Sequence, residues 1–467
     1  MPLPPLPPAD GTPAVPLATA VGGPAAAGPP RRFDRERVTL WRVALVAGMA
    51  FLYAELIAVI IGMDDILFRQ LVALSVGGAG FASIGWLAWR GELFRHPFAL
   101  WPLVLVAVML MVSLFSNTIF FPKPLKDWLP AHYVYLPVMQ LYILMALRFT
   151  DREVIWGLAF AGLVAAVLMV VYRFGLWDVL SHYARRSIFG LDVSRIVIMK
   201  HEFFFASLAM FAVLLAPSVP FAGKVAAAVA LAVCMALQIE VVQSRQGMLA
   251  TGVGMLVMLA VDRRSFHTKP FLVRATMLVI GAMVVPLLMW DYVEMLFRDD
   301  LLDSRELNVA VRFHTFDHYS HYFHVTHGLG FGMMSATGTR NNVLAESLSM
   351  HVNITDLGLY GSFMQFGIVG GSLAVLLTGF VIYYSLRTAR RLPQDEAWMP
   401  ALLGAYFLGW MCVPVQLNAF TMSTSIHFGA FVFYLAWYYR CRGRYEAMAG
   451  ASRPGAPGAA GALPAAA

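Results

Sequence analysis

The stretch VIWGLAFAGLVAAVLMVV, residues 154–171, decides the fold class of this chain because it contains no charged and no strongly polar residue. About 20 apolar residues are needed for a helix to cross the hydrocarbon core of a membrane. A transmembrane β-strand would instead alternate apolar and polar residues over about ten positions. The stretch is continuously apolar, so it predicts a transmembrane helix.

The composition of the whole chain points the same way. Hydrophobic residues make up 59% of its 467 residues, charged residues 13%, and its mean hydropathy is +0.68, whereas soluble domains carry about 25% charged residues. Only a multi-spanning membrane protein fits these values. The net charge of +7 gives no reason to expect nucleic acid, because Lys and Arg gather in the cytoplasmic loops of membrane proteins.

Similar apolar runs bring the number of predicted spans to twelve, so we expect an all-α, polytopic helical bundle. The runs are Val38–Gly62, Leu71–Trp89, Pro97–Phe115, Ala131–Leu147, Val154–Val171, Phe203–Val219, Val225–Ile239, Gly247–Val261, Phe271–Trp290, Leu357–Ser385, Met399–Leu417 and Met422–Tyr439. The membrane domain then covers residues 38–445. The Pro/Ala/Gly-rich residues 1–30 lead into a basic cluster, and we expect disordered tails at 1–37 and 446–467.

The distribution of basic residues predicts the orientation of the bundle. The first run is too long for a signal peptide and lacks a cleavage site, so it is expected to be retained, with the N-terminus inside. Every loop on the inner side then carries Lys or Arg, as the positive-inside rule requires. These residues are Arg90, Arg95, Arg148, Arg152, Lys224, Arg263, Arg264, Lys269, Arg387, Arg390, Arg391, Arg440, Arg442 and Arg444. Both termini are therefore expected in the cytoplasm.

Basic residues also occur on the predicted outer side, where they should be rare. The loop 178–202 contains Arg195, the turn before the eighth span contains Arg245, and the large polar loop 291–356 contains Arg312. Topology does not explain them, and a bound anion would. The sequence therefore predicts an anion site on the outer face.

The polar loop 291–356 holds six of the twelve histidines, and three of them, His314, His318 and His321, are spaced so that one helix face could present them to a metal. The carboxylates nearby do not complete a ligand pattern, and the three cysteines lie within or at the ends of apolar runs. We therefore expect no metal site, no disulfide framework and no cofactor.

Three short elements carry the functional signal. The first is Ser244-Arg245-Gln246-Gly247, where the arginine could hold a phosphate or simply reach the membrane interface. The second is a helix with an apolar and aromatic face, from which Arg312 is displaced, and it ends at the glycine-rich turn Gly328–Gly332. The third runs from His351 through Asp356 into a span with glycines at 358, 361, 367 and 370. Asp356 fits a helix cap and a catalytic group equally well.

In their order and topology, these elements resemble the superfamily of O-antigen polymerases and O-antigen ligases. The resemblance covers about the C-terminal half of the chain. It implies a membrane glycosyltransferase in the bacterial inner membrane, active at the periplasmic face. The donor would be an undecaprenyl-diphosphate-linked glycan, and the acceptor a second glycan. By motif, Arg245 and Arg312 would contact the diphosphate, and so would Arg195 from the earlier loop, without a metal ion.

The third element departs from the ligase pattern, in which a His-Asn pair lies eleven residues before the Gly-x-x-Gly. Asp356 occupies that position here, and His351 lies five residues earlier. This favours a polymerase of O-antigen or exopolysaccharide repeat units over a ligase that transfers the glycan to lipid A–core. The base stays open between His351 and Asp356. Membrane lipid and other polysaccharide-assembly proteins are the further expected partners.

A transporter of lipid-linked oligosaccharide or of anions is the alternative from another functional class, and a non-catalytic scaffold is a third. Transporters place polar groups near the membrane midplane and show related halves. The sequence has no internal repeat, and only Glu55 is clearly within a span. Polar groups gather instead in the outer loop, which favours an enzyme.

Overall fold

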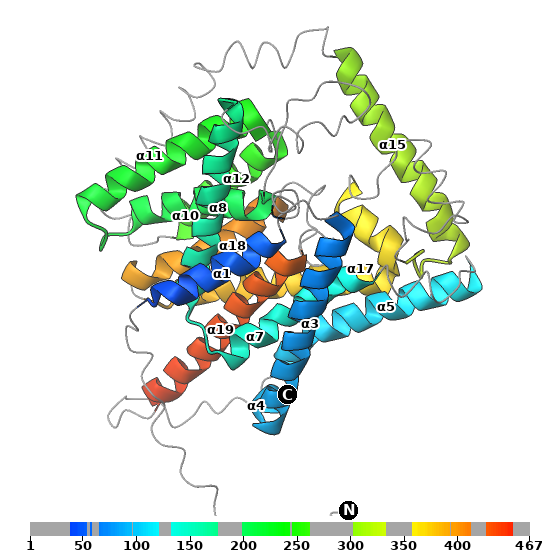
Figure 1. Ribbon diagram of the computed structural model, residues 1–467, viewed down its shortest axis with the longest axis horizontal. Coiled ribbons are helices and arrows are strands. Elements are labelled where there is room, and N and C mark those ends of the chain that lie inside the picture. Colours follow the sequence, from blue (N-terminus) through cyan, green and yellow to red (C-terminus); the bar gives the residue numbers. More distant parts are fainter. Residues whose placement is uncertain are drawn as a thin grey trace, which may run out of the picture. The chain divides into compact units, whose positions relative to one another are not determined.

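The computed structural model describes residues 38–53, 57, 65–95, 97–120, 132–175, 199–242, 245–261, 302–332, 357–392, 394–411 and 426–451. All of them belong to one compact unit, Val38–Ala467. The described residues form helices and connecting turns, and no strand occurs among them. The predicted all-α class is therefore confirmed for this part of the chain (Figure 1).

Helices occupy the predicted spans, except for Phe271–Trp290, which lies outside the described residues. They are α1 (Leu40–Leu52), α3 (Asp65–Trp89), α4 (Glu92–Arg95), η1 (Pro97–Leu100), α5 (Trp101–Ile119), η2 (Tyr133–Met139), α7 (Gln140–Ala146), α8 (Asp151–Arg173), α10 (Lys200–Leu215), α11 (Phe221–Leu237), η3 (Gln238–Val242), α12 (Arg245–Val261), α15 (Leu302–Val325), α17 (Leu359–Ala389), α18 (Gln394–Met411) and α19 (Ile426–Ala451). The last helix continues beyond residue 446, where we expected a disordered tail to begin.

Five of the described helices are long and apolar enough to cross a membrane, which indicates a membrane protein. They cover Leu67–Trp89, Pro97–Ile119, Asp151–Arg173, Phe221–Val242 and Leu359–Ala389. Three further apolar helices are shorter, namely Leu40–Leu52, Tyr133–Ala146 and Gly247–Val261. At 1.5 Å per residue, a helix as short as α10 falls below the 30 Å of the hydrocarbon core. The predicted number of twelve spans therefore goes beyond what these helices establish.

Large apolar side chains cover the outside of these helices. Leu74 on α3 is 59% exposed, Met111 on α5 is 62% exposed, Val229 on α11 is 60% exposed and Val369 on α17 is 63% exposed. Soluble monomers rarely expose contiguous apolar surface of this kind. The exposed surface is therefore suited to lipid rather than to water.

The segments predicted as inner loops meet at one end of the described bundle. The Arg42 guanidinium lies 3.3 Å from the Glu153 carboxylate and also donates to the backbone oxygen of Arg148. Arg148 in turn forms a 2.8 Å ion pair with Glu92. Further along the chain, Arg442 of α19 pairs with Glu396 of α18. Sequence segments far apart are thus joined by charged side chains at this end.

The bundle interior is close-packed where α8 meets α10. Gly162 of α8 lies directly against the backbone of Glu202 and the side chain of Ala206. A Cβ atom at position 162 would lie 2.6 Å from the Cβ of Ala206, closer than real Cβ contacts come. The backbone of α10 cannot move away without leaving the core, so only glycine fits here.

We predict that Gly162→Ala lowers the stability of the protein by about 1–3 kcal/mol, the usual cost of overpacking a core. Gly85→Ala in α3 is the matched control, because nothing lies within 4 Å of the Cβ that it would add. Thermal unfolding in detergent measures both variants. Equal melting temperatures for the two variants would show that α8 and α10 leave room for a side chain at position 162.

Candidate functional site

A buried pair of ionisable side chains joins α10 to α19. Nε2 of His427 lies 2.9 Å from Oε1 of Glu202, and the two residues are only 6% and 1% exposed. A charge in such an environment is stable only when it is paired and hydrogen-bonded. Ionisable groups inside a membrane bundle are costly and are functional candidates by default.

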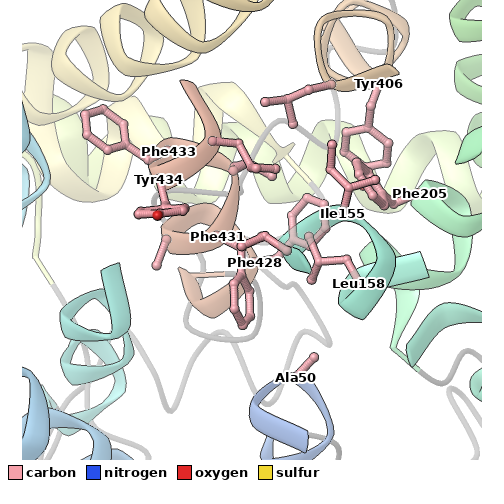
Figure 2. Packing of buried hydrophobic residues seen from close by; sticks show 14 of the residues in the cluster. Ala50, Ile155, Leu158, Phe205, Tyr406, Phe428, Phe431, Phe433 and Tyr434 are labelled. Atoms are coloured by element: carbon pink, nitrogen blue, oxygen red, sulfur yellow. The ribbon is translucent and has the colours of Figure 1, made fainter. Parts of the chain in front are cut away.

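Aromatic and amide groups enclose this pair. The Tyr53 ring stacks on the His427 ring at 4.6 Å between centroids, and Gln140 of α7 donates its side-chain N–H to the backbone oxygen of His427. Next to Glu202, Nδ1 of His201 lies 2.8 Å from the hydroxyl of Tyr406. The rings of Tyr406, Phe205 and Phe428 pack against one another beside this hydroxyl, in the hydrophobic core drawn in Figure 2. Aromatic rings and hydrogen bonds therefore surround the pair.

Several polar atoms around the pair are buried and lack a partner within the described part of the chain. They are Nδ1 of His427, Oε1 of Gln140 and the hydroxyl of Tyr53, and Oε1 of Gln238 lies in the same state on η3. Leaving one such atom unsatisfied costs about 1–3 kcal/mol. Unsatisfied buried atoms in native proteins usually mark an ordered water or a ligand. The first three belong to His427 and to two side chains that contact it, which makes this the strongest candidate for a polar binding site in the described part of the chain.

The starts of α10 and α12 lie beside the pair, together with the end of α18. Gly247 of α12 packs directly on the ring of Phe204 of α10, and Gly409 of α18 lies against the backbone oxygen of Ala250. Trp410 links them, because its ring lies 5.3 Å from that of Phe204 and 5.5 Å from the ammonium of Lys200. Figure 1 also shows α10 and α12 near each other.

This arrangement favours anions at the start of α12. Helix N-termini carry a partial positive charge and free N–H groups, and two of them come together here. Arg245 is the first residue of α12, two positions before the glycine that touches Phe204, and Lys200 is the first residue of α10. The helix starts therefore bring two cationic residues to the same region as the buried pair.

The glycine-rich turn Gly328–Gly332 follows α15 and packs against α17. Its backbone N–H groups at Phe331 and Gly332 donate to the carbonyls of Met364 and Gln365, and the N–H of Ile368 donates back to Gly328. The helix α17 kinks at this point, since Gly367 has φ 70° and ψ −176°. We expected the flexible turn to approach a ligand. It approaches the backbone of α17 instead, and so fixes the end of the helix that carries Arg312.

Most histidines of α15 point away from the core. His314, His321 and His324 are exposed, as is His327 in the turn after α15, whereas Thr315 and Tyr319 of the helix and Thr326 just after it are buried. His318 is partly buried against the rings of Tyr319 and Tyr322. The described residues contain no group of three or more His, Cys, Asp and Glu side chains that could hold a metal.

The residues predicted from sequence to form the site are only partly covered by the structure. Arg195, His351 and Asp356 lie outside the described residues. Arg245 and Arg312 lie within α12 and α15, but their side chains lie outside the described part. Their roles at a diphosphate and as a base therefore stay predictions, and what the structure adds is the position of the helices that carry two of them.

Sequence reasoning missed the buried pair. In the sequence, Glu202 falls at the end of the predicted outer loop 178–202, and His427 falls within the apolar run Met422–Tyr439. Glu55 is the only acid that the sequence places clearly within a span. The structure puts Glu202 in the first turn of α10, facing the core. The signal was present, because an ionisable residue within an apolar run is a functional candidate by default.

Comparison with models of known protein families finds no family that matches this chain. No curated protein matches it either.

Proposed function

We propose that this protein is a membrane glycosyltransferase that polymerises undecaprenyl-diphosphate-linked repeat units into O-antigen or exopolysaccharide. The reaction takes place at the outer face of the bacterial inner membrane, in a bundle of twelve spans with both termini in the cytoplasm and the loop 291–356 outside. The donor is a lipid-linked glycan, and the acceptor is a second lipid-linked unit. No metal ion is required.

The observation that carries this proposal is the meeting of two helix N-termini, α10 and α12, beside a buried Glu–His pair. A diphosphate carries several negative charges, and helix N-termini together with arginine forks are the groups that bind such anions. Arg245 starts one of these helices and Lys200 starts the other. The docking of the turn Gly328–Gly332 on α17 supports the proposal further, because it joins two of the three resembling elements in space.

The chemistry follows from the charge on the leaving group. When a sugar leaves a diphosphate, negative charge develops on the oxygen of the broken bond. Arginines in a partly dehydrated site stabilise that charge electrostatically, as a metal ion would. Arg245, Arg312 and Arg195 are assigned this role. Direct attack by a hydroxyl of the acceptor sugar inverts the anomeric configuration, and it needs a proton acceptor, for which His351 and Asp356 are the candidates in the outer loop.

A transporter is the second candidate, because the buried pair of Glu202 and His427 is a specific observation in its favour. Ionisable pairs inside a bundle mark proton relays in many transporters. The two candidates differ in where lipid-linked units accumulate when the protein is absent.

Deletion in cells that make the chain separates these functions. If the protein is a polymerase, its deletion should remove long glycan and cause single lipid-linked repeat units to accumulate at the outer face. If it is a transporter, its deletion should cause the same units to accumulate at the inner face. If it is a ligase, its deletion should leave long glycan on the lipid carrier instead of on lipid A–core. Either of the last two results would contradict the proposal.

A further inference from the structure

We propose that His427, oriented by Glu202, is the proton acceptor for the hydroxyl of the incoming sugar. The inference rests on the proposed function and adds a catalytic residue to it. It places the base inside the bundle, on α19, instead of in the loop 291–356 where sequence reasoning looked for it.

The geometry of the pair defines which nitrogen is available. Oε1 of Glu202 lies 2.9 Å from Nε2 of His427, and an ionised carboxylate can only accept a hydrogen bond. Nε2 therefore carries the proton of the neutral imidazole, and Nδ1 keeps its lone pair. Nδ1 is buried and has no hydrogen-bond partner within the described part of the chain. A base held in one tautomer by a carboxylate, with its other nitrogen unprotonated and without a partner in the described residues, has the polarity required for general base catalysis.

Two neighbouring atoms suit a hydroxyl-rich ligand. Oε1 of Gln140 is an acceptor, and the hydroxyl of Tyr53 is both a donor and an acceptor. Both are buried without a partner in the described residues, and both belong to side chains that contact His427. A sugar offers several hydroxyl groups, which can donate to such acceptors and accept from the tyrosine hydroxyl. An apolar ligand would leave all three atoms unsatisfied.

The surrounding groups set the electrostatic environment of His427. Within the described residues, Glu202 and Tyr53 contact His427 directly, and His201 and Lys200 of α10 and Tyr406 of α18 lie in the ring contacts around it. Only Glu202 is an acid among them, and it is the residue bonded to His427. The carboxylate therefore stabilises the positive imidazolium that forms when Nδ1 takes a proton.

The proposed step balances without a further reactant. The O–H bond of the acceptor hydroxyl breaks and its proton goes to Nδ1 of His427. The oxygen forms a bond to the anomeric carbon of the donor sugar. The bond from that carbon to the diphosphate oxygen breaks, and its electron pair stays on the diphosphate. The imidazolium later returns the proton to water.

The test measures chain growth by the purified full-length protein in lipid, with lipid-linked repeat units, as a function of pH. We expect His427→Gln to reduce kcat by about 10²-fold or more, the range that general bases contribute. Glu202→Gln preserves the shape of the pair and is expected to reduce kcat less, with KM unchanged. His427→Gln removes the proposed base and is expected to lose the acidic limb of the pH profile, whereas Glu202→Gln retains the base and keeps that limb. Thr378→Val, an isosteric change of a buried hydroxyl on α17, is the control and keeps both rate and profile.

A third variant guards against misfolding. His427→Ala opens space at the ring, and added imidazole is expected to restore part of its activity if His427 acts as a base. Wild-type rates and pH profiles for His427→Gln and Glu202→Gln, together with a dead His351→Gln, would overturn this inference and leave the proposed function standing. Chain growth absent from the wild-type protein itself would overturn both.

Discussion

Replacing Arg245 with alanine is expected to reduce chain growth by about 10²–10³-fold, the effect of removing one group that stabilises charge on a leaving oxygen. The first residue of α12 lies beside the start of α10, where Gly247 packs on Phe204. A cation at this place adds to the positive ends of both helices. Its loss removes stabilisation that matters most when the diphosphate leaves, so kcat falls more than KM rises. Initial rates with purified protein measure both.

Two matched variants serve as controls for this prediction. Arg245→Lys keeps the charge but loses the planar fork that binds a phosphate through two N–H groups, so we expect an intermediate rate. Arg390→Ala removes an arginine just after the C-terminal end of α17, in a predicted inner loop, and should leave the rate unchanged. Full polymer length from Arg245→Ala at normal membrane levels would mean that the diphosphate binds elsewhere.

Gly367→Ala is expected to separate α15 from α17. Gly367 has φ 70° and ψ −176°, a backbone conformation that is essentially confined to glycine and that costs other residues about 1–3 kcal/mol. An added Cβ would also lie against the backbone carbonyl of Leu329. The turn Gly328–Gly332 can then no longer keep its hydrogen bonds to α17, and Arg312 loses its support. We expect faster proteolysis around the turn and strongly reduced chain growth.

Gly379→Ala is the control for this change, because it lies in the same helix and nothing is found within 4 Å of its added Cβ. It should keep the proteolysis pattern and the rate of the wild-type protein. Equal behaviour of the two variants would show that the kink at Gly367 does not hold α15.

The sequence predicted the helical class well because its signal is local. The run 154–171 is apolar throughout, and α8 covers it as Asp151–Arg173. Glu153 also marks the start of this helix in the sequence, because it forms a capping box with Thr150. The number of spans was harder to predict, because an apolar run does not show how long its helix is: α17 is long and apolar enough to cross a membrane, whereas α10 has only 16 residues.

The candidate site was harder to predict because it is assembled from distant parts of the chain. Glu202 and His427 are 225 positions apart, and nothing local shows that they meet. The glycines of the turn 328–332 looked suited to a ligand, since a glycine permits any close approach. Only the fold reveals that the approaching partner is α17. Arg195, Arg245 and Arg312 were chosen as candidates from their predicted place in the topology. The pair of Glu202 and His427 could be recognised only from the packing of α10 against α19.

The central claim is tested most directly by incubating the purified protein in lipid with an undecaprenyl-diphosphate-linked repeat unit and no divalent metal ion. The products are then separated by length. We expect a ladder of longer lipid-linked glycans, with the new linkage inverted at the anomeric carbon. Unchanged single repeat units, or transfer only after lipid A–core is added, would contradict the assignment as a polymerase.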